Sequence, residues 1–245
     1  MPQFLIPSSE VRDRKAVLSG EEAHHARDVF RMKQGDAIQL FDGRGTGYRG
    51  VIAALSSKEI EVRIAETIRE EPRAAFRSIL AQSLVSKEAM DCVVQKATEL
   101  GIDVIAPVIA RRSQIRPDQK RGEEKRQHWE KTALAACKQC DRLTLPRILP
   151  VVTLVEWLAG APPKGRTCYA DVAENSVTFE SYLAELGGGG GDVAVVIGPE
   201  GDFDDTEREL FRAKNVRPVS LGSTVLRSDT AALYAASLLR SAGAL

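Results

Sequence analysis

Short apolar runs alternate with amphipathic stretches along most of the chain that follows residue 76. The run Val193–Ile197 is mostly β-branched and unbroken by polar residues, which is typical of a strand covered on both faces. The stretch Lys87–Leu100 has the spacing of an amphipathic helix and is ended by Gly101. Because strands and helices alternate, the pattern predicts an α/β fold, a parallel sheet with helices on both faces. The other predicted strands cover residues 76–84, 103–110, 166–173 and 217–222, and the other predicted helices cover residues 118–140, 204–215 and 228–243.

Residues 1–70 follow a different pattern, with strands that alternate apolar and polar positions. The stretch 36–55 indicates a strand, a glycine-rich turn and a second strand, and residues 58–68 alternate like a further half-buried strand. One helix is expected at Glu21–Phe30, with Ser19 as its cap. This unit resembles a small β-barrel, and Glu70–Arg73 is a plausible linker. We therefore expect two domains, residues 1–72 and residues 73–245.

Composition narrows the class of protein. The chain has 245 residues, of which 43% are hydrophobic, so a sizeable core is expected. It contains no run of eighteen apolar residues and no signal-peptide core, so we expect a soluble, cytoplasmic protein without a membrane partner. Cys137-x-x-Cys140 has no second ligand pair nearby, so free thiols and no metal site are expected.

Charge is balanced overall and uneven along the chain. The 34 basic and 34 acidic residues cancel, which taken alone argues against a nucleic-acid partner. Residues 73–150, however, carry 15 basic and 9 acidic groups, and the excess lies almost wholly within residues 111–147. Such a segment can follow a phosphate backbone, although a solvated helix face remains the alternative.

Two strand-to-helix turns carry the candidate chemistry, and the first is Gly198-Pro199-Glu200-Gly201. Its glycines let a ligand approach the backbone, and Asp204, Asp205 or Thr206 can cap the helix that follows. The turn has no lysine or arginine and is followed by several carboxylates, which disfavours a phosphate and favours a phosphate-free or cationic ligand. A tight turn with no ligand is the alternative.

The second turn follows Gly222 and precedes a helix that Ser228 or Asp229 can cap. Between them lies an apolar loop with a single cation, Arg227. In a parallel sheet both turns lie at the carboxyl ends of their strands, so neighbouring strands would let them enclose a pocket suited to an aromatic base. A G-x-G-x-x-G motif and a Walker lysine are absent, which argues against dinucleotides and ATP.

The two turns together carry a resemblance. The stretches "IGPEGDFDDTE" and "VSLGSTVLRSDTAAL" resemble the C-terminal motifs of the SPOUT methyltransferase superfamily, and within it those of the RsmE type, bacterial 16S rRNA uridine-N3 methyltransferases. The stretches "QSLVSKEAMDCVVQKATELGIDVIAPVIARRS" and "HHARDVFRMKQGDAIQLFDGRG" are similar to the same family. The resemblance covers nearly the whole chain.

The resemblance implies a fold, a cofactor and partners. It implies a PUA-like RNA-binding domain at residues 1–72 and a methyltransferase domain at residues 73–245 that ends in a deep trefoil knot. It also implies a homodimer, S-adenosylmethionine as methyl donor, and 16S rRNA or the small ribosomal subunit as substrate. The residues expected to surround the donor are Ala170, Ile197, Gly198, Pro199, Glu200, Gly201, Leu221, Gly222, Val225, Leu226, Thr230 and Ala231.

Transfer to N3 of uridine needs a cation or donors near the ring oxygens, where negative charge develops. We predict Arg227 as the first candidate for this catalytic role and Arg142 as the second. An ion pair of Arg227 with Glu200 or Asp229 is the structural alternative, and Glu200 is expected to order its own turn. The residues expected to contact RNA are Arg111, Arg112, Arg116 and Lys138.

The chain departs from the family pattern at a few positions. Asp202 stands where the family usually has glycine, and Lys138 and Asp141 replace the usual glutamate and glycine. Two other functions stay open: a SPOUT enzyme that methylates a ribose 2′-hydroxyl or another base, and a non-catalytic RNA-binding assembly factor. Donor binding separates the second from the enzymes, and the position of the methyl group separates the first.

Overall fold

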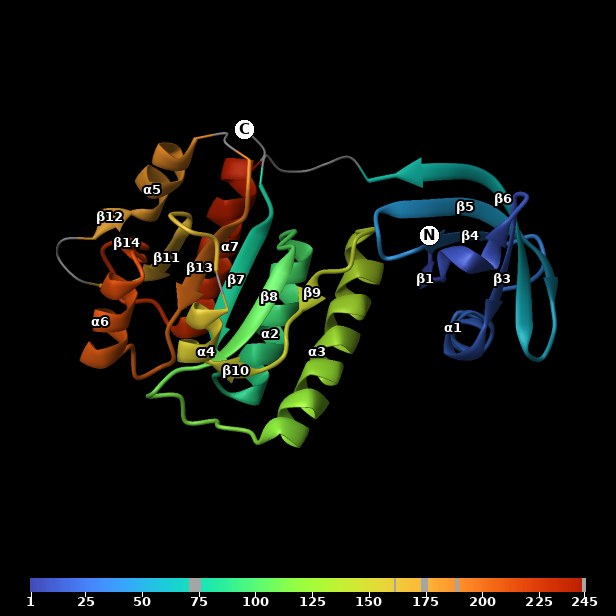
Figure 1. Cartoon of the computed structure of the whole chain (residues 1–245). Helices are drawn as coiled ribbons and strands as arrows, with labels where there is room; N and C mark the ends of the chain where they lie inside the picture. Colours follow the sequence, from blue (N-terminus) through green and yellow to red (C-terminus); the bar gives the residue numbers. More distant parts are fainter. Residues whose placement is uncertain (71–75, 161, 173–175, 188–189, 244–245) are drawn as a thin grey trace. The chain divides into compact units, whose positions relative to one another are not determined.

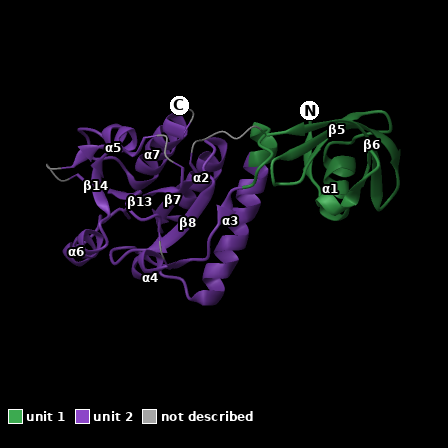
Figure 2. Cartoon of the chain, turned by 45° about the horizontal axis from the view of Figure 1, so that its top comes forward, with its two compact units in different colours: residues 1–72, 137–145 green, residues 73–136, 146–245 purple. Residues whose placement is uncertain are grey.

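The computed structural model describes residues 1–70, 76–160, 162–172, 176–187 and 190–243 (Figure 1). Contacts divide the chain into two compact units (Figure 2). Unit 1 comprises residues 1–72 and 137–145, and unit 2 comprises residues 73–136 and 146–245. The segment 137–145, which the sequence pattern placed with the second domain, thus makes its contacts with the N-terminal unit. Of the linker predicted at Glu70–Arg73, only Glu70 lies among the described residues.

Unit 1 is built on a six-stranded sheet with the order β1-β4-β5-β6-β3-β2. The pairing is antiparallel except between β1 and β4, which are parallel. Its own core contains Phe4, Leu18, Ile38 and Ile60, all at most 2% exposed. A separate N-terminal β domain is therefore confirmed. The strands are β1 (Gln3–Leu5), β2 (Val11–Arg12), β3 (Lys15–Ser19), β4 (Ala37–Phe41), β5 (Thr46–Leu55) and β6 (Glu59–Arg69).

The helix predicted at Glu21–Phe30 is present in altered form. An α-helix, α1 (Gly20–His24), continues as a turn of π-helix, η2 (His25–Val29), and a short 3₁₀-helix, η1 (Ser8–Glu10), precedes both. Ser19 stands at the cap position of α1, but its side chain makes no capping hydrogen bond. The extent of the helix was predicted from spacing, and spacing carries no sign of a π turn.

Unit 2 contains an eight-stranded sheet with the order β10-β8-β7-β13-β11-β14-β12, and β9 pairs with β8. Every pairing between its described strands is parallel, which confirms the predicted α/β class. The strands are β7 (Ser78–Ser83), β8 (Val104–Ile109), β9 (Arg147–Ile148), β10 (Val152–Thr153), β11 (Thr167–Ala170), β12 (Val177–Thr178), β13 (Val193–Ile197) and β14 (Arg217–Ser220).

The helices of unit 2 include two that the sequence pattern did not reveal, α4 and α5. Both are short, and each begins at a threonine whose hydroxyl accepts a backbone N–H three residues later, Thr153 in α4 and Thr178 in α5. The helices are α2 (Lys87–Glu99), α3 (Gln119–Cys140), α4 (Leu154–Ala159), α5 (Phe179–Leu186), α6 (Asp205–Ala213) and α7 (Ser228–Gly243).

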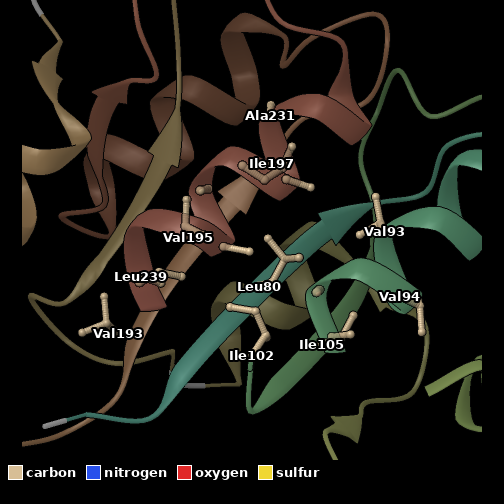
Figure 3. Close-up of a cluster of buried hydrophobic side chains, with 14 of the residues drawn as sticks. Leu80, Val93, Val94, Ile102, Ile105, Val193, Val195, Ile197, Ala231 and Leu239 are labelled. Carbon is tan, nitrogen blue, oxygen red and sulfur yellow. The ribbon is translucent and has the colours of Figure 1, made fainter. Parts of the chain in front are cut away.

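Helices cover both faces of this sheet. Successive residues of β13 belong to different core clusters: Val193, Val195 and Ile197 pack in one, and Val196 packs in another. The first cluster also holds side chains from α2, α3, α5 and α7, and Figure 3 shows part of it. The second holds side chains from α4 and α6. A strand covered in this way has no polar face, which explains its unbroken apolar sequence.

Candidate functional site

A concave site in unit 2 lies where β13, β11 and β14 end. It is a cavity of about 760 Å³, and it occupies the carboxyl edge of the parallel sheet, where open α/β folds bind ligands. Of the twelve residues expected around a donor, Gly201 and Thr230 are not in its lining. The other ten are: Ala170, Ile197, Gly198, Pro199, Glu200, Leu221, Gly222, Val225, Leu226 and Ala231.

The two turns are not carried by neighbouring strands, which was the condition that the sequence analysis attached to a shared pocket. β11 pairs with β13 on one side and with β14 on the other. Its carboxyl end therefore supplies a wall between the two turns, with Ala170 and Asp171 in the lining. Strand order depends on pairing between segments distant in sequence, and a local pattern does not contain it.

The first turn holds Asp202 in a left-handed backbone conformation, with φ of 60°. This conformation favours glycine, and aspartate is one of the few other residues that adopt it readily. The Asp202 carboxylate also stabilises the turn, because Oδ1 accepts the N–H of Phe203 at 2.7 Å and Oδ2 pairs with Arg208 at 2.6 Å. The Asp202 side chain thus stabilises the turn in which aspartate replaces the family's usual glycine.

Arg208 on α6 joins two walls of the cavity. Its guanidinium donates to both oxygens of Asp171 at 3.2 and 3.3 Å, to Asp202 at 2.6 Å, and to the carbonyl of Phe203 at 2.5 Å. The hydrogen bonds to Asp171, followed by those to Asp202, raise the pKa of Arg208 against the effect of burial. Asp171 ends the β11 wall and Asp202 belongs to the β13 turn, so one side chain fixes both.

A buried carboxylate connects the first turn to the loop after β8. Asp204 caps α6, as predicted, in a capping box with Glu207. Glu207 is 2% exposed. Its Oε2 accepts the N–H of Asp204 within the capping box, and its Oε1 accepts the N–H of Arg111 at 2.8 Å. Arg111 also pairs with Asp204 at 2.8 Å, and Arg112 donates to the carbonyl of Gly201 at 2.9 Å. Both arginines, predicted to contact RNA, thus brace the cavity wall with part of their hydrogen-bonding capacity.

The second turn is far more open. Val225 is 83% exposed, and the exposed Arg227 makes no ion pair with any described residue. Its predicted alternative role, a salt bridge to Glu200 or Asp229, is therefore not realised in the described part of the chain. Gly222 has φ of +124°, and a side chain added there would meet no protein atom within 4 Å. The turn leaves both its backbone and its cation accessible at the cavity.

Ser228 connects the second turn to the first instead of capping α7. Its hydroxyl donates to the carbonyl of Gly198 at 2.5 Å and accepts Nε2 of Gln82 at 2.9 Å. Gln82, on β7, is fully buried. Asp229, the other predicted cap, accepts only the adjacent N–H of Thr230 at 2.8 Å among the hydrogen bonds of the described residues. Ser228 thereby orients the carbonyl at the start of the glycine turn.

The remaining predicted residues fall in different places. Glu200 lines the cavity, but its side chain makes no hydrogen bond within the described chain, so it does not order its turn; Asp202 does that instead. Arg116 donates to the backbone carbonyls of its own loop, at Ala110, Arg111 and Ser113. Arg142 and Lys138 belong to unit 1 and are not in the cavity lining.

Both of these unit 1 residues are mostly buried. Arg142 is 3% exposed, and its carbonyl accepts Nε2 of Gln3 at 3.0 Å. Lys138 pairs with Glu22 at 2.5 Å, with both side chains at most 20% exposed. Their surroundings are those of packed polar residues within unit 1.

Sequence reasoning missed one wall entirely. Residues at the start of α2 line the cavity together with the two turns, among them Ser86, whose hydroxyl caps α2 by accepting the N–H of Ala89. The signal was present, since β7 is another apolar strand followed by a capped helix. The missed lining residues are Val85, Ser86, Glu88, Ala89, Cys92, Asp171, Val172, Asp202, Ser220, Thr224, Ser228 and Asp229.

The lining is acidic. Arg227 is its single cation, against five carboxylates, two of which Arg208 partly neutralises from behind. Such a site favours a ligand with positive charge and an apolar, planar part. The five carboxylates are those of Glu88, Asp171, Glu200, Asp202 and Asp229.

Metal chemistry finds no support among the described residues. They contain no group of three or more histidine, cysteine or acidic side chains arranged to hold a metal ion, and the four cysteines are free. Burial raises the pKa of the Cys168 thiol far above its usual value, so this sulfur is not a nucleophile. No helix in the described part of the chain is long and apolar enough to cross a membrane.

Comparison with known proteins places these features in a family. An RNA methyltransferase domain family matches residues 72–240, and an RNA methyltransferase PUA domain family matches residues 18–65. The chain is 28% identical to ribosomal RNA small subunit methyltransferase E of Bacillus subtilis, over 91% of this chain and 88% of that protein. It is 29% identical to the protein of that name from Rickettsia conorii, over 92% and 88%.

Solved structures give the same result. The chain is 32% identical to a methyltransferase of Legionella pneumophila in complex with bound SAM, with a TM-score of 0.87 over 98% of this chain and 97% of that one. It is 26% identical to ribosomal RNA small subunit methyltransferase E of Neisseria gonorrhoeae bound to S-adenosyl methionine, with a TM-score of 0.86 and the same coverage. Both similarities extend over the two units described above.

Proposed function

The chain belongs to the RNA methyltransferase family, and from this membership we propose that it transfers a methyl group from S-adenosylmethionine to 16S ribosomal RNA. The proposed acceptor is the N3 atom of one uridine in the small ribosomal subunit. The observation that carries the proposal is the acidic, glycine-walled cavity at the ends of β13, β11 and β14, in a chain similar over almost its full length to enzymes with bound donor.

The chemistry of the cavity fits this donor. S-adenosylmethionine supplies an activated methyl group on a positively charged sulfur, and it also carries an adenine and an amino-acid end. The acidic lining suits the positive charges, and Leu221, Val225 and Leu226 supply apolar surface for a base. At Gly222, which lines the cavity, a side chain would extend into open space, so the bare backbone leaves room for a ligand.

We assign the donor site to the ten lining residues from the sequence prediction, with Gly201 and Thr230 as supporting neighbours. Gly201 is held through its carbonyl by Arg112, and Thr230 belongs to the first turn of α7. Backbone groups of the two turns would orient the base of the donor. Positioning of this kind accounts for much of the rate gain when two reactants must meet in line.

Arg227 is the proposed catalytic residue. Its guanidinium is exposed at the cavity and has no carboxylate partner among the described residues, so it is available to the substrate. As uridine N3 loses its proton and attacks, negative charge spreads to O2 and O4, where a cation stabilises it. Arg142 stays the second candidate, although its mostly buried side chain gives it less access to a substrate.

Further parts of the proposal concern assembly and substrate. We propose that residues 1–72 form a PUA-like RNA-binding domain, and that residues 73–245 form the methyltransferase domain with a C-terminal trefoil knot. Arg111, Arg112, Arg116 and Lys138 are proposed to contact RNA phosphates in addition to the bonds described above. A cytoplasmic location is proposed because the proposed substrate is ribosomal RNA, and a homodimeric active form is proposed because the family resemblance implies one.

The test is to incubate the purified chain with labelled S-adenosylmethionine and small ribosomal subunits that lack the modification. Digestion and mass spectrometry of the RNA then locate the methyl group. The proposal expects one N3-methyluridine per subunit. A methyl group on a ribose 2′-hydroxyl would favour the alternative of a ribose methyltransferase. RNA binding without any methyl transfer would favour a non-catalytic assembly factor.

A further inference from the structure

A second cavity, separate from the donor site, lies between α2 and α3. It has a volume of about 370 Å³, which is the scale of a single small ligand. Its floor is apolar, formed by Leu84, Val85, Met90, Ile115 and Trp129. We call this cavity the α2–α3 groove. Nothing in the proposed transfer reaction has yet given it a role.

The rim of the groove is charged and mostly basic. One face of α3 contributes Arg121, Lys125 and His128, spaced so that they lie above one another on the helix, and α2 contributes Lys87 and Asp91. The exposed Glu124 of α3 also lines the groove, so its rim carries three lysine or arginine side chains against two carboxylates. Asp91 accepts Nζ of Lys87 at 2.8 Å and lies 2.9 Å from Nε2 of His128. Burial alone would raise the pKa of Asp91, but these two hydrogen bonds outweigh it and lower that pKa.

Lys125 differs from the other cations of the rim. Its side chain is half-buried at the groove, and it makes no ion pair or hydrogen bond with any residue that the structure describes. A lysine that is partly removed from water without a carboxylate partner is a good site for an external anion. The apolar floor below it would suit a flat base, so the groove combines the two surfaces that one nucleotide presents.

The groove adjoins the donor cavity. Val85 lines both, and the first turn of α2 separates them. Glu88 and Ala89 face the donor cavity, whereas Lys87 and Met90 face the groove. A strand of RNA that placed one nucleotide in the donor cavity would therefore find the groove across a single turn of helix.

We propose that the α2–α3 groove binds one nucleotide of the RNA substrate that flanks the methylated uridine, with its base on the apolar floor and its phosphate at Lys125. This inference rests on the proposed function, because it takes RNA as the substrate. It adds an RNA contact on the groove-lining face of α3 to the contacts proposed for Arg111, Arg112 and Arg116, which also hold the loop before that helix.

The experiment measures equilibrium binding of the full chain to fluorescently labelled 16S rRNA in small-subunit particles, across a range of salt concentrations. Lys125→Met keeps the aliphatic stem and removes the charge, and Lys125→Arg restores it. Lys131→Met is the matched control, because Lys131 is an exposed lysine on α3 that does not line the groove. Ile115→Ala tests the apolar floor.

We expect Lys125→Met to weaken RNA binding by about tenfold, the equivalent of one hydrogen bond to a charged group. The slope of log affinity against log salt should fall by about 0.7–0.9, as for one lost phosphate contact. Lys125→Arg should restore both values, and Ile115→Ala should weaken binding without changing the slope. Lys131→Met should change neither quantity, and no variant should alter affinity for S-adenosylmethionine.

Equal affinity and slope in Lys125→Met, Lys131→Met and the unchanged chain would overturn the inference and leave the proposed methyl transfer standing. A change in the sedimentation of the free protein on Lys125→Met would assign the groove to a second copy of the chain, which also overturns it. If the chain binds RNA without methylating it, the proposed function fails while the groove remains tested. A chain that binds no RNA would contradict both.

Discussion

The two turns that enclose the donor cavity differ in how they are held. The Gly198–Asp202 turn is fixed by Arg208, by Arg112 and by Ser228, and its flanking helix begins in a capping box. Among the described residues, the Gly222–Arg227 turn has hydrogen bonds only between Ser220 and Gly222 and from the Ala231 N–H to the Arg227 carbonyl. Leu226 packs against the core, and the tip of the turn at Val225 is largely exposed. In the sequence, both turns follow the same order of a strand, a glycine and a helix. Only the contacts in the folded structure show that the two turns are held differently.

The difference suggests a division of labour. A turn held by several side-chain hydrogen bonds keeps one conformation, so it can present a preformed wall to the donor without reorganisation. A turn with few contacts opens at low free-energy cost, which suits the side that must admit and release an RNA nucleotide.

Gly198→Val should disrupt the Gly198–Asp202 turn. A Cβ atom at this position would already lie 3.3 Å from the Phe203 ring, and valine adds two further methyl groups. Phe203 is fully buried and cannot move aside easily. Overpacking of this kind costs up to about 3 kcal/mol, so donor affinity should fall by up to roughly a hundredfold. Gly198→Ala should cause a smaller loss of donor affinity. If both variants bound the donor as tightly as the unchanged chain does, the donor site would lie elsewhere.

Arg227→Met should remove the catalytic cation of the Gly222–Arg227 turn without disturbing the Gly198–Asp202 turn. Removing one group that stabilises developing charge typically lowers kcat by about a hundredfold. Because the side chain makes no ion pair with the described residues, donor affinity and stability should stay unchanged. Arg212→Met, an exposed arginine on α6, is the control and should keep full activity. Normal turnover in Arg227→Met would remove this residue from the mechanism.

Arg208→Met should weaken the contacts that hold the Gly198–Asp202 turn. It deprives Asp171, whose side chain is 3% exposed, and Asp202 of their shared partner. Losing hydrogen bonds between charged groups of this kind costs about 2–3 kcal/mol of unfolding free energy. Both tryptophans, Trp129 and Trp157, lie in unit 2, so their fluorescence in urea reports on this unit alone.

The exposed pair Arg217–Glu185 supplies the comparison for that measurement. Its side chains are 45% and 53% exposed, so Arg217→Met should cost at most about 1 kcal/mol. Equal losses in the two arginine variants would mean that Arg208 does not brace the cavity walls.

The difference in stability between two substitutions at Asp202 should be small, and it isolates the backbone conformation of this residue. Asp202→Gly and Asp202→Ala both lose the bonds to Phe203 and Arg208, but only alanine is strained at a φ of 60°. Alanine should therefore be less stable than glycine by about 1 kcal/mol in the same urea measurement. If the two variants were equally stable, the turn would not depend on a left-handed residue.

Much of the fold could be predicted because local patterns determine it. The unbroken apolar run of β13 and the helical spacing of α2 reflect burial, and burial is written in the hydrophobic pattern. The capping of α6 by Asp204 was predictable for the same reason, since the cap and Glu207 are three residues apart. Helix α4 carries a similar signal in Thr153 and Glu156 but is only one or two turns long, too short for its spacing to be distinctive.

What could not be predicted depends on contacts between distant segments. Arg208 meets Asp171 across 37 positions, and Arg111 meets Glu207 across 96. The place of β11 between the two turns, and the packing of residues 137–145 with unit 1, arise in the same way. The sequence thus indicated ten donor-site residues and Arg227 of the cavity lining, while the α2 wall and the bracing that distinguishes the two turns required the structure.

Calorimetric titration with S-adenosylmethionine tests the central claim most directly. The measurement compares the unchanged chain with Gly198→Val and Arg227→Met under identical conditions. The account predicts one binding site per chain, no measurable binding in Gly198→Val, and undiminished affinity in Arg227→Met. Absence of binding to the unchanged chain, or equal binding in Gly198→Val, would contradict it.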